Sequence, residues 1–538
     1  GHGVSSLDGR SRKHAGTFVM LTRPGADETH GEAIGVSLAY SGNFDIGVNV
    51  SSLGGVRLRA GINPELFRWR LEPGESFQTP EALIVHSDQG LGALSRTFHT
   101  LLRTRMARGP WRDRRRPVAL NTYEALYMNV DERNVMELAD QAADLGMELV
   151  VVDDGWFGQR DWDDASIGDW AAHPVKFPRG LKPVADHVHG LGLKFGLWFE
   201  PEMVNADSDL YRAHPDWVLG DATYELSIGR HQYVLDLTRP EVRDHIVEAL
   251  SAVIGGNDVD YVKWNMNRSL SEVFSAAWPA EAQGEIYHRY VLGYYDLMSR
   301  LLERFPELLI EAGSGGGARL DPAVLAFSPQ HWISEDTDAM ERVKIQYGTS
   351  YAYPLSVMSN HVTPVPNAQT GRVASLKTRG DVALFGVFGY ELDPRSLDGE
   401  DRRLIREQIA LSKEYSELLR CGDFYRLLDP FRANSAFAPA DAAWIVVSRN
   451  RREALVGYYR TRVGVNVPVR YLRLAGLDER VRYAVDEIGF DVERRPRYGD
   501  ELERVGLALI DGSNCQLHPR VPLGDNLSRI FHLHALDE

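Results

Sequence analysis

Acidic, amide and tryptophan side chains follow one apolar run after another in the middle of this sequence. Asp153 and Asp154 end one such run, Asn265 and Asn267 end another, and Glu335 follows a third. Sugar hydroxyls form hydrogen bonds with charged and amide groups, whereas the C–H faces of a sugar ring stack on aromatic rings. Because several of the 11 tryptophans lie beside these residues, the pattern favours a carbohydrate site.

The adjacent carboxylates Asp153 and Asp154 repel each other after a buried strand. Capping of a helix is the ordinary explanation for such a pair, but a polyol that shares hydrogen bonds between the two carboxylates accounts for it better. The glycine-rich run at residues 313–317 lacks the lysine and hydroxyl of a phosphate loop. We interpret it as a tight turn that brings backbone close to a ligand.

Single histidines at His331 and His361 are more often structural than metal-binding. The sequence contains no HExxH motif, no facial triad and no Cys/His spacing typical of zinc. It therefore implies no metal and no organic cofactor.

Short apolar runs alternate with amphipathic helices from Pro117 to about Leu419, which is typical of βαβ units. Asp131 is a good N-cap for the clearest of these helices. Eight candidate strands lie near Ala119, Val150, Phe195, Val262, Leu309, Ile333, Ser356 and Leu384. Eight units favour an α/β fold of the (β/α)8 TIM barrel type over an open doubly wound sheet, and its chemistry is expected at the carboxyl ends of the strands.

Runs that alternate with a period of two flank this region on both sides. We predict a β-sandwich portion at residues 1–105, the barrel at 106–420 and an antiparallel β domain at 421–538. The first portion is short for a self-contained sandwich and is expected to be truncated. The arginine-rich residues 111–116 are interpreted as a solvated linker.

Charge and cysteine content limit the partners and the compartment. The 538 residues carry a net charge of −16, which disfavours nucleic acid and anionic membranes because both bind basic surfaces. No apolar run approaches the roughly 20 residues of a membrane span. With only Cys421 and Cys515 present, we expect a reducing compartment, the cytoplasm. The sequence starts at Gly1 without methionine, so a targeting segment is not assessable.

Ordered motifs along most of the chain resemble glycoside hydrolase family 36, the bacterial α-galactosidases. The motifs are Asn121-Thr-Tyr-Glu-Ala125, Asp153-Asp-Gly-Trp-Phe-Gly158, Trp198-Phe-Glu-Pro-Glu-Met-Val-Asn205, Gly229-Arg230, Lys263-Trp-Asn-Met-Asn-Arg268 and Ile345-Gln-Tyr-Gly-Thr-Ser350. The resemblance implies a retaining enzyme with an N-terminal β-supersandwich, a catalytic barrel and a C-terminal β domain. It implies small α-galactosides, such as raffinose or melibiose, as substrates. A homo-oligomer is among the expected states, because family members are often oligomers and the short N-terminal region leaves a strand edge for another chain to cover.

The resemblance places the nucleophile and the acid/base at positions 265 and 335. The family has Asp at the first of these positions, so Asn265 replaces the nucleophile. An amide is a far poorer nucleophile than a carboxylate, and we expect the chain to be close to inactive. Glu335 replaces a family Asp and reaches about one bond further, which makes Asp336 a candidate substitute.

Other side chains receive sugar-binding roles from the resemblance. Asp153 and Asp154 would bind the hydroxyls at C4 and C6, and Trp198 would line the pocket. Further hydroxyls would be held by Lys263, Arg230 and Asn267.

Two more departures from the family lie in this pocket. Tyr123 stands where the family usually has Trp, and Gly313 stands where it has Cys. The first exchanges an indole for a smaller ring with a hydroxyl, and the second opens space near the sugar. Specificity for N-acetylgalactosamine or a pentopyranose is therefore an alternative to galactose.

Asn265 has two explanations. Its near-isosteric shape suits a variant prepared to hold intact substrate, whereas a natural non-hydrolytic sugar-binding protein is the explanation that Glu335 favours. A transglycosylase of the same fold is the nearest alternative activity. A phosphate-binding aldolase-type barrel is supported only by Lys263 at a strand end.

Overall fold

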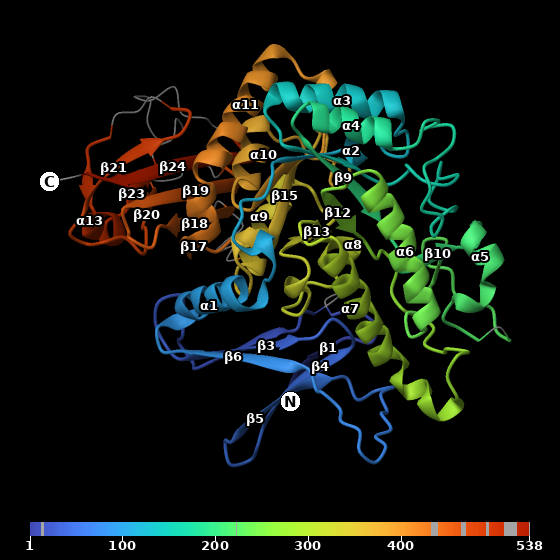
Figure 1. Ribbon diagram of the computed structural model, residues 1–538. Helices are drawn as coiled ribbons and strands as arrows, with labels where there is room; N and C mark the ends of the chain where they lie inside the picture. Colours follow the sequence, from blue (N-terminus) through green and yellow to red (C-terminus); the bar gives the residue numbers. More distant parts are fainter. Residues whose placement is uncertain are drawn as a thin grey trace.

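The computed structural model describes residues 1–11, 15–221, 223–431, 440–463, 470–490, 494–509 and 524–536. Three regions follow one another along the chain, namely N-terminal β-sheets, a central barrel and a C-terminal β-sheet (Figure 1). Cys421 is a free thiol, while Cys515 lies outside the described residues.

Eight parallel strands close into a barrel, in the order β12-β13-β14-β15-β16-β7-β8-β9. In chain order they are β7 (Ala119–Asn121), β8 (Leu149–Val152), β9 (Lys194–Phe199), β12 (Tyr261–Trp264), β13 (Leu309–Ala312), β14 (Gln330–Trp332), β15 (Met358–Val362) and β16 (Val387–Tyr390). Between β9 and β12, the strands β10 (Met203–Asn205) and β11 (Gln232–Val234) pair as a separate two-stranded antiparallel sheet. The predicted (β/α)8 architecture is confirmed.

The last three strands differ slightly from their predicted positions. Ile333 directly follows β14, Ser356 lies in a 3-10 turn before β15, and Leu384 caps the helix that precedes β16. Apolar residues continue from these strands into the adjoining turns and helices, so periodicity alone does not separate the elements.

Helices cover the outside of the barrel (Figure 1). In α3 (Glu132–Leu145), Asp131 accepts a hydrogen bond from the Asn134 amide at 2.7 Å, and Gly146 ends the helix in the left-handed region at φ 88°. The other helices of this region are α2 (Tyr123–Leu126), α4 (Lys182–Gly190), α5 (Asp209–Ala213), α6 (Pro240–Gly256), α7 (Ile286–Arg304), α8 (Ser314–Gly317), α9 (Ala339–Thr349), α10 (Leu376–Ala383), α11 (Gly399–Glu414) and α12 (Ser416–Cys421). Across the described ranges, no helix combines the length and apolar character that crossing a bilayer requires.

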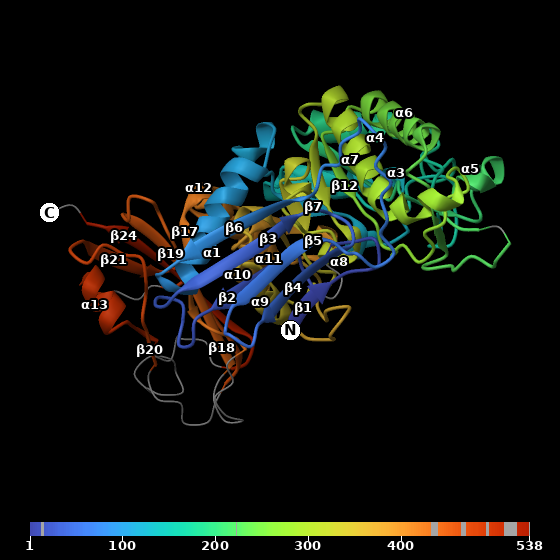
Figure 2. The same ribbon diagram turned by 90° about the horizontal axis from the view of Figure 1, so that it is seen from below.

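Two three-stranded antiparallel sheets form the N-terminal region, with strand orders β1-β4-β5 and β2-β3-β6. The strands are β1 (His2–Ser5), β2 (Phe18–Thr22), β3 (Ala33–Ala39), β4 (Phe44–Val50), β5 (Val56–Ile62) and β6 (Glu81–Ser87), followed by α1 (Gly90–Leu101). Leu94 and Phe98 of α1 are buried against the second sheet. Both sheets lie on one side of the barrel (Figures 1 and 2).

A six-stranded antiparallel sheet, ordered β17-β18-β19-β24-β21-β22, dominates the C-terminal region. The strands are β17 (Asp423–Leu428), β18 (Ala440–Val447), β19 (Glu453–Arg462), β21 (Arg482–Glu487), β22 (Arg497–Tyr498) and β24 (Leu527–Ala535), with β20 (Arg470–Leu472), β23 (Leu507–Leu509) and α13 (Gly499–Arg504) beside them. One face buries Ile530 and Leu455 against the barrel helices, and the other buries Phe531 and Leu533 beneath β20 and β23.

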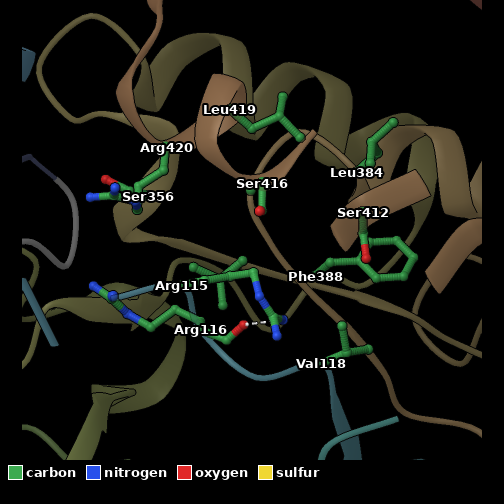
Figure 3. Close-up of a pocket in the computed structure, with 12 residues that line it drawn as sticks. Arg115, Arg116, Val118, Ser356, Leu384, Phe388, Ser412, Ser416, Leu419 and Arg420 are labelled. Atoms are coloured by element: carbon green, nitrogen blue, oxygen red, sulfur yellow. Dashed lines mark hydrogen bonds between the residues drawn. The ribbon is translucent and has the colours of Figure 1, made fainter. Parts of the chain in front are cut away.

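The arginine-rich stretch is only partly the solvated linker that was predicted. Arg115 is exposed and pairs with Glu148 at 2.6 Å, but Trp111 is buried and Arg116 is half-buried. Arg115, Arg116 and Val118 line a cavity of about 50 Å³ at the amino ends of the barrel strands (Figure 3). This volume suits one or two waters, and catalysis in such barrels occurs at the opposite end.

Candidate active site

The sequence-predicted site residues gather at the carboxyl ends of the barrel strands. Asp153 and Asp154 follow β8, Trp198 lies in β9, and Lys263 lies in β12 with Asn265 directly after it. The remaining members lie on the loops and short helices that leave the barrel at the same end, and they are Tyr123, Arg230, Asn267, Gly313, Glu335 and Asp336.

Separate cations neutralise the two adjacent carboxylates. Lys263 Nζ donates to Asp153 Oδ2 at 2.8 Å, and Asn121 Nδ2 donates to the same oxygen at 2.6 Å. Asp154 forms a bidentate pair with Arg160, through Nε at 2.9 Å and Nη2 at 2.8 Å. All these groups are buried. Their mutual repulsion is therefore relieved by the protein itself, and a polyol is not required to explain the pair.

Lys263 is the central cation of this group. Burial tends to lower the pKa of the Lys263 ammonium, but nearby carboxylates, led by Asp153 and Glu391, raise it above its ordinary value. The ammonium also lies 5.5 Å from the centre of the Trp332 ring. Lys263 is thus held as a charged hydrogen-bond donor.

The Asn265 side chain is fixed by two backbone N–H groups. Its Oδ1 accepts from the Met266 amide at 3.0 Å and from the Gly315 amide at 3.0 Å. The side chain is buried, and its own backbone amide donates to Phe199 O at 2.8 Å. Two N–H donors at this oxygen would stabilise a negative charge at position 265.

The glycine-rich turn at residues 313–317 lies between the two predicted catalytic positions. A Cβ added to Gly313 would lie 2.7 Å from Asn265 Oδ1, and one added to Gly316 would lie 2.8 Å from the Glu335 amide. Gly315 and Gly316 have φ values of 61° and 80°, which disfavour side chains. The space at Gly313, which was expected to open toward the sugar, is filled by the Asn265 amide oxygen.

Glu335 is less constrained than Asn265. Its side chain is exposed, and its Oε2 accepts one hydrogen bond from Trp332 Nε1 at 2.9 Å. Asp336 Oδ1 instead accepts from the Asp338 amide at 3.0 Å at the start of α9. Of these two acids, Glu335 is the one that packs against the glycine-rich turn, because a Cβ added to Gly316 would lie 3.2 Å from Glu335 Cγ.

A third buried carboxylate, Glu200, lies in the Trp198–Asn205 motif but received no role from the sequence. Its oxygens accept from the Asn267 amide, from Gln232 Nε2 at 2.9 Å and from Asn267 Nδ2 at 3.2 Å. Burial raises the pKa of Glu200 to about 7, although these hydrogen bonds oppose the shift. Glu200 thus orients Asn267 rather than leaving it free to turn.

The aromatic residues occupy different depths. Trp198 is only 2% exposed and stacks on Phe157, with ring centres 6.1 Å apart, so it lies in the wall behind the carboxylates. Tyr123 begins α2 and is half-buried. Burial and the nearby Asp153 raise the pKa of the Tyr123 phenol to about 12, which keeps it protonated as a donor.

Arg230 lies on the rim of the mouth. It is exposed, has a φ of 53° and lines a cavity of about 480 Å³ together with Asn267 and Gly315. Arg10 forms part of the same wall, and it donates to Ser269 Oγ at 2.7 Å and to Met266 O at 3.2 Å. A residue so distant in sequence could not be found from strand-end motifs.

Further acids surround the opening. Glu124 of α2 accepts from Thr337 Oγ1 at 3.1 Å, and burial, together with Glu391, raises the pKa of Glu124 to about 7. Glu391 pairs with His361 Nδ1 at 3.0 Å. In the described part of the chain, no three His, Cys, Asp or Glu ligand atoms of the mouth lie close together as a metal site would require. The arrangement is that of a polar, charge-compensated pocket for a hydroxylated ligand.

Models of known protein families match most of the chain. A family model described as Melibiase matches residues 76–422, and models described as the glycosyl hydrolase family 36 N-terminal and C-terminal domains match residues 1–72 and 441–533. The chain is 49% identical to α-galactosidase AgaA of Geobacillus stearothermophilus over 506 residues, which cover 94% of this chain and 68% of that protein. It is 42% identical to α-galactosidase Mel36A of Lactobacillus acidophilus over 536 residues, which cover 99% and 70%.

Solved structures of α-galactosidases have the same fold as this chain. The crystal structure of AgaA superposes with a TM-score of 0.94 at 47% identity, and it covers 99% of this chain and 71% of the other. A doubly substituted AgaA in complex with raffinose superposes with a TM-score of 0.94 at 46% identity and the same coverage.

Proposed function

The chain belongs to glycoside hydrolase family 36, and on that premise we propose that its barrel mouth is the site of a retaining exo-α-galactosidase whose nucleophile position holds Asn265. The ligand is the terminal α-linked galactose of a small oligosaccharide. As the sequence stands, this site binds an α-galactoside but cleaves it only very slowly.

The observation that carries the proposal is the environment of the residue 265 side chain. One of its oxygens receives two backbone N–H groups, from Met266 and Gly315. Such donors hold the pKa of a carboxylate low and would keep an aspartate ionised. The surroundings therefore suit a carboxylate nucleophile, although the residue itself is an amide.

The chemistry of the Asn265→Asp variant follows from these positions. A carboxylate oxygen of the substituted side chain attacks the anomeric carbon and forms an ester, while Glu335 donates its proton to the departing glycosidic oxygen. Glu335 then takes a proton from water, the water oxygen attacks the same carbon, and the ester bond to the substituted side chain breaks. Galactose leaves with the α configuration retained. With Asn265, the amide nitrogen lone pair is delocalised, so the first bond does not form at a useful rate.

The sugar is held by the compensated carboxylates in this proposal. Asp153, oriented by Lys263, and Asp154, oriented by Arg160, accept from the hydroxyls at C4 and C6. Tyr123, Arg230 and Asn267 bind further hydroxyls at the rim, and Trp198 supports the wall. A Cβ added to Gly313 would lie 2.7 Å from Asn265 Oδ1, so the missing side chain at Gly313 opens no free space toward Asn265.

A panel of substrates tests the sugar and the reaction together. The Asn265→Asp variant is assayed with aryl α-galactoside, aryl α-N-acetylgalactosaminide and aryl β-L-arabinopyranoside, and NMR records the anomer first released. We expect hydrolysis of the α-galactoside with release of α-galactose. Preferential cleavage of either other sugar would change the assigned substrate, and transfer exceeding hydrolysis at high acceptor concentration would show a transglycosylase.

A non-hydrolytic sugar-binding protein is the second candidate, and the observation that favours it is the exposed, singly hydrogen-bonded Glu335. This function predicts sugar binding by both forms and no turnover by the Asn265→Asp variant. We further propose a cytoplasmic protein, on the basis of its low cysteine content, and a homo-oligomer.

A further inference from the structure

A cluster of histidines and carboxylates lies on the C-terminal sheet, away from the barrel mouth. The residues are His532 and His534 of β24, Asp486 of β21 and Glu453 of β19. These three strands lie side by side, with β24 in the middle (Figure 1). No catalytic role proposed above uses any of the four.

Strand register brings their side chains to one face. His532 and His534 are two residues apart and therefore point the same way. Asp486 is paired directly with His532 across β21 and β24, and Glu453 is paired directly with His534 across β19 and β24. Directly opposed residues of an antiparallel sheet share a face, so each histidine has a carboxylate on a neighbouring strand.

The donor atoms converge. His534 Nδ1 lies 3.5 Å from Asp486 Oδ2, and His532 Nε2 lies 3.1 Å from Glu453 Oε1. Ligand atoms of Asp486, His532 and His534 all lie within 4.8 Å of one another. Zinc at about 2.0–2.1 Å from each ligand places tetrahedral ligands about 3.3 Å apart, which is close to the His534–Asp486 distance of 3.5 Å and the His532–Glu453 distance of 3.1 Å.

The cluster is also partly sheltered. Ile530, on the same face of β24, is buried against the barrel helices. His532 and His534 are the next residues on that face, at the edge of this buried contact. The Tyr415 ring, at the end of α11, lies 4.9 Å from the His532 ring. Glu414, Glu453 and Asp486 also lie near the Tyr415 phenol. Negative charge therefore collects around the two imidazoles.

We propose that His532, His534 and Asp486, with Glu453 as a fourth ligand, bind a divalent transition metal ion such as Zn²⁺. Two neutral imidazoles and two carboxylates are a donor set that zinc accepts in tetrahedral geometry. The ion would join the three strands at this end of the sheet. Its role is structural, because the site belongs to a different domain from the proposed catalytic groups.

Zinc titration of the full chain tests the proposal. The protein, free of any histidine tag and treated with chelator, is titrated with ZnCl₂ in a calorimeter. We expect one equivalent to bind with a Kd below about 100 µM, and His532→Gln and His534→Gln each to weaken binding by at least about tenfold. His187→Gln is the matched control, because His187 also pairs with a single carboxylate, Asp140 at 2.8 Å, and we expect it to leave zinc binding unchanged.

A second readout guards against misfolded variants. Zinc at saturating concentration raises the Tm by about 2–4 °C, and this rise disappears in Asp486→Asn, an exposed substitution that leaves the zinc-free Tm unchanged. Cobalt(II) in place of zinc gives the visible absorption of a tetrahedral ion. Absence of saturable binding below about 1 mM, or binding that persists in the His532→Gln/His534→Gln double variant, would overturn the proposal.

Discussion

The two halves of the barrel mouth satisfy their polar groups in different ways. The half that we propose binds the sugar, called here the binding half, consists of Asp153, Asp154, Arg160 and Lys263, and each of its carboxylates has its own buried cation. The half to which we assign the chemistry, called here the catalytic half, consists of Asn265, the turn at residues 313–317 and Glu335, and it holds an uncharged amide and one exposed acid.

Under the proposed function, this difference means that separate groups of residues support sugar binding and bond cleavage in the same pocket. Charge pairs orient the binding half before any ligand arrives, which favours affinity. The catalytic half keeps the backbone donors for an anion at position 265, yet the anion is missing. A change confined to one atom of Asn265 would therefore alter turnover without altering recognition.

Removal of the acid should produce the largest effect in the catalytic half. In the Asn265→Asp background, Glu335→Gln lowers kcat/KM on raffinose by about 10³- to 10⁴-fold, because the leaving oxygen is no longer protonated. An activated dinitrophenyl α-galactoside, which needs little protonation, loses much less. Asp336→Asn is the control, and a larger loss there than at Glu335→Gln would transfer the acid/base role to Asp336.

Breaking one charge pair should damage the binding half. Lys263→Met leaves Asp153 buried without its cation, and it lowers the free energy of unfolding by about 3–5 kcal/mol, as measured by urea denaturation. Raffinose affinity, measured by calorimetry, falls at the same time by at least about 100-fold. The exposed Lys182→Met variant should change neither quantity, and an intact affinity in Lys263→Met would contradict the proposed role of the pair.

Stability should depend on pH through Glu200, the buried carboxylate that holds Asn267. Burial raises the pKa of Glu200 from 4.5 to about 7. The free energy of unfolding that Glu200 contributes through this shift is therefore complete below about pH 4.5, and it is lost as the pH rises through 7. The free energy of unfolding of the unmodified protein, minus that of Glu200→Gln, should therefore fall by up to about 3 kcal/mol between pH 4 and pH 8. A difference that rises with pH would show that Glu200 is ionised at neutral pH.

The smallest predicted effect concerns the contact between Gly313 and Asn265. Gly313→Ala places a Cβ 2.7 Å from Asn265 Oδ1, which costs about 1–3 kcal/mol of unfolding free energy. Gly348→Ala in α9 meets nothing within 4 Å and should be neutral or stabilise the helix by up to about 1 kcal/mol. Equal free energies of unfolding of the two variants in urea denaturation would show that the turn at residues 313–317 shifts at little cost to admit the Cβ.

The fold was largely predictable because strand and helix periodicities are local. Asp131 and the apolar spacing that follows it specify α3 in sequence alone. Strand-end position also predicted that Asp153, Lys263 and Asn265 lie together at the barrel mouth, as they do. Where helix ends and strands are both apolar, as at Leu384, periodicity did not separate them.

Partners that meet only in three dimensions were not predictable. Arg160 compensates Asp154 from a loop, Arg10 reaches Met266 from the N-terminal region, and His534 meets Asp486 across two strands. No local sequence pattern predicts these contacts. They also changed the interpretation of the Asp153 and Asp154 pair, whose repulsion is relieved by cations rather than by a ligand.

The most direct test compares raffinose binding and cleavage by the unmodified protein and its Asn265→Asp variant. Affinity is measured by calorimetry at short times, turnover by chromatography of released galactose, and mass spectrometry verifies that Asn265 has not deamidated. We predict affinities within about threefold of each other and turnover faster in the variant by at least on the order of 10³-fold. Equal turnover in the two proteins, or absence of raffinose binding by the unmodified protein, would contradict a complete binding half beside a catalytic half that lacks only its nucleophile.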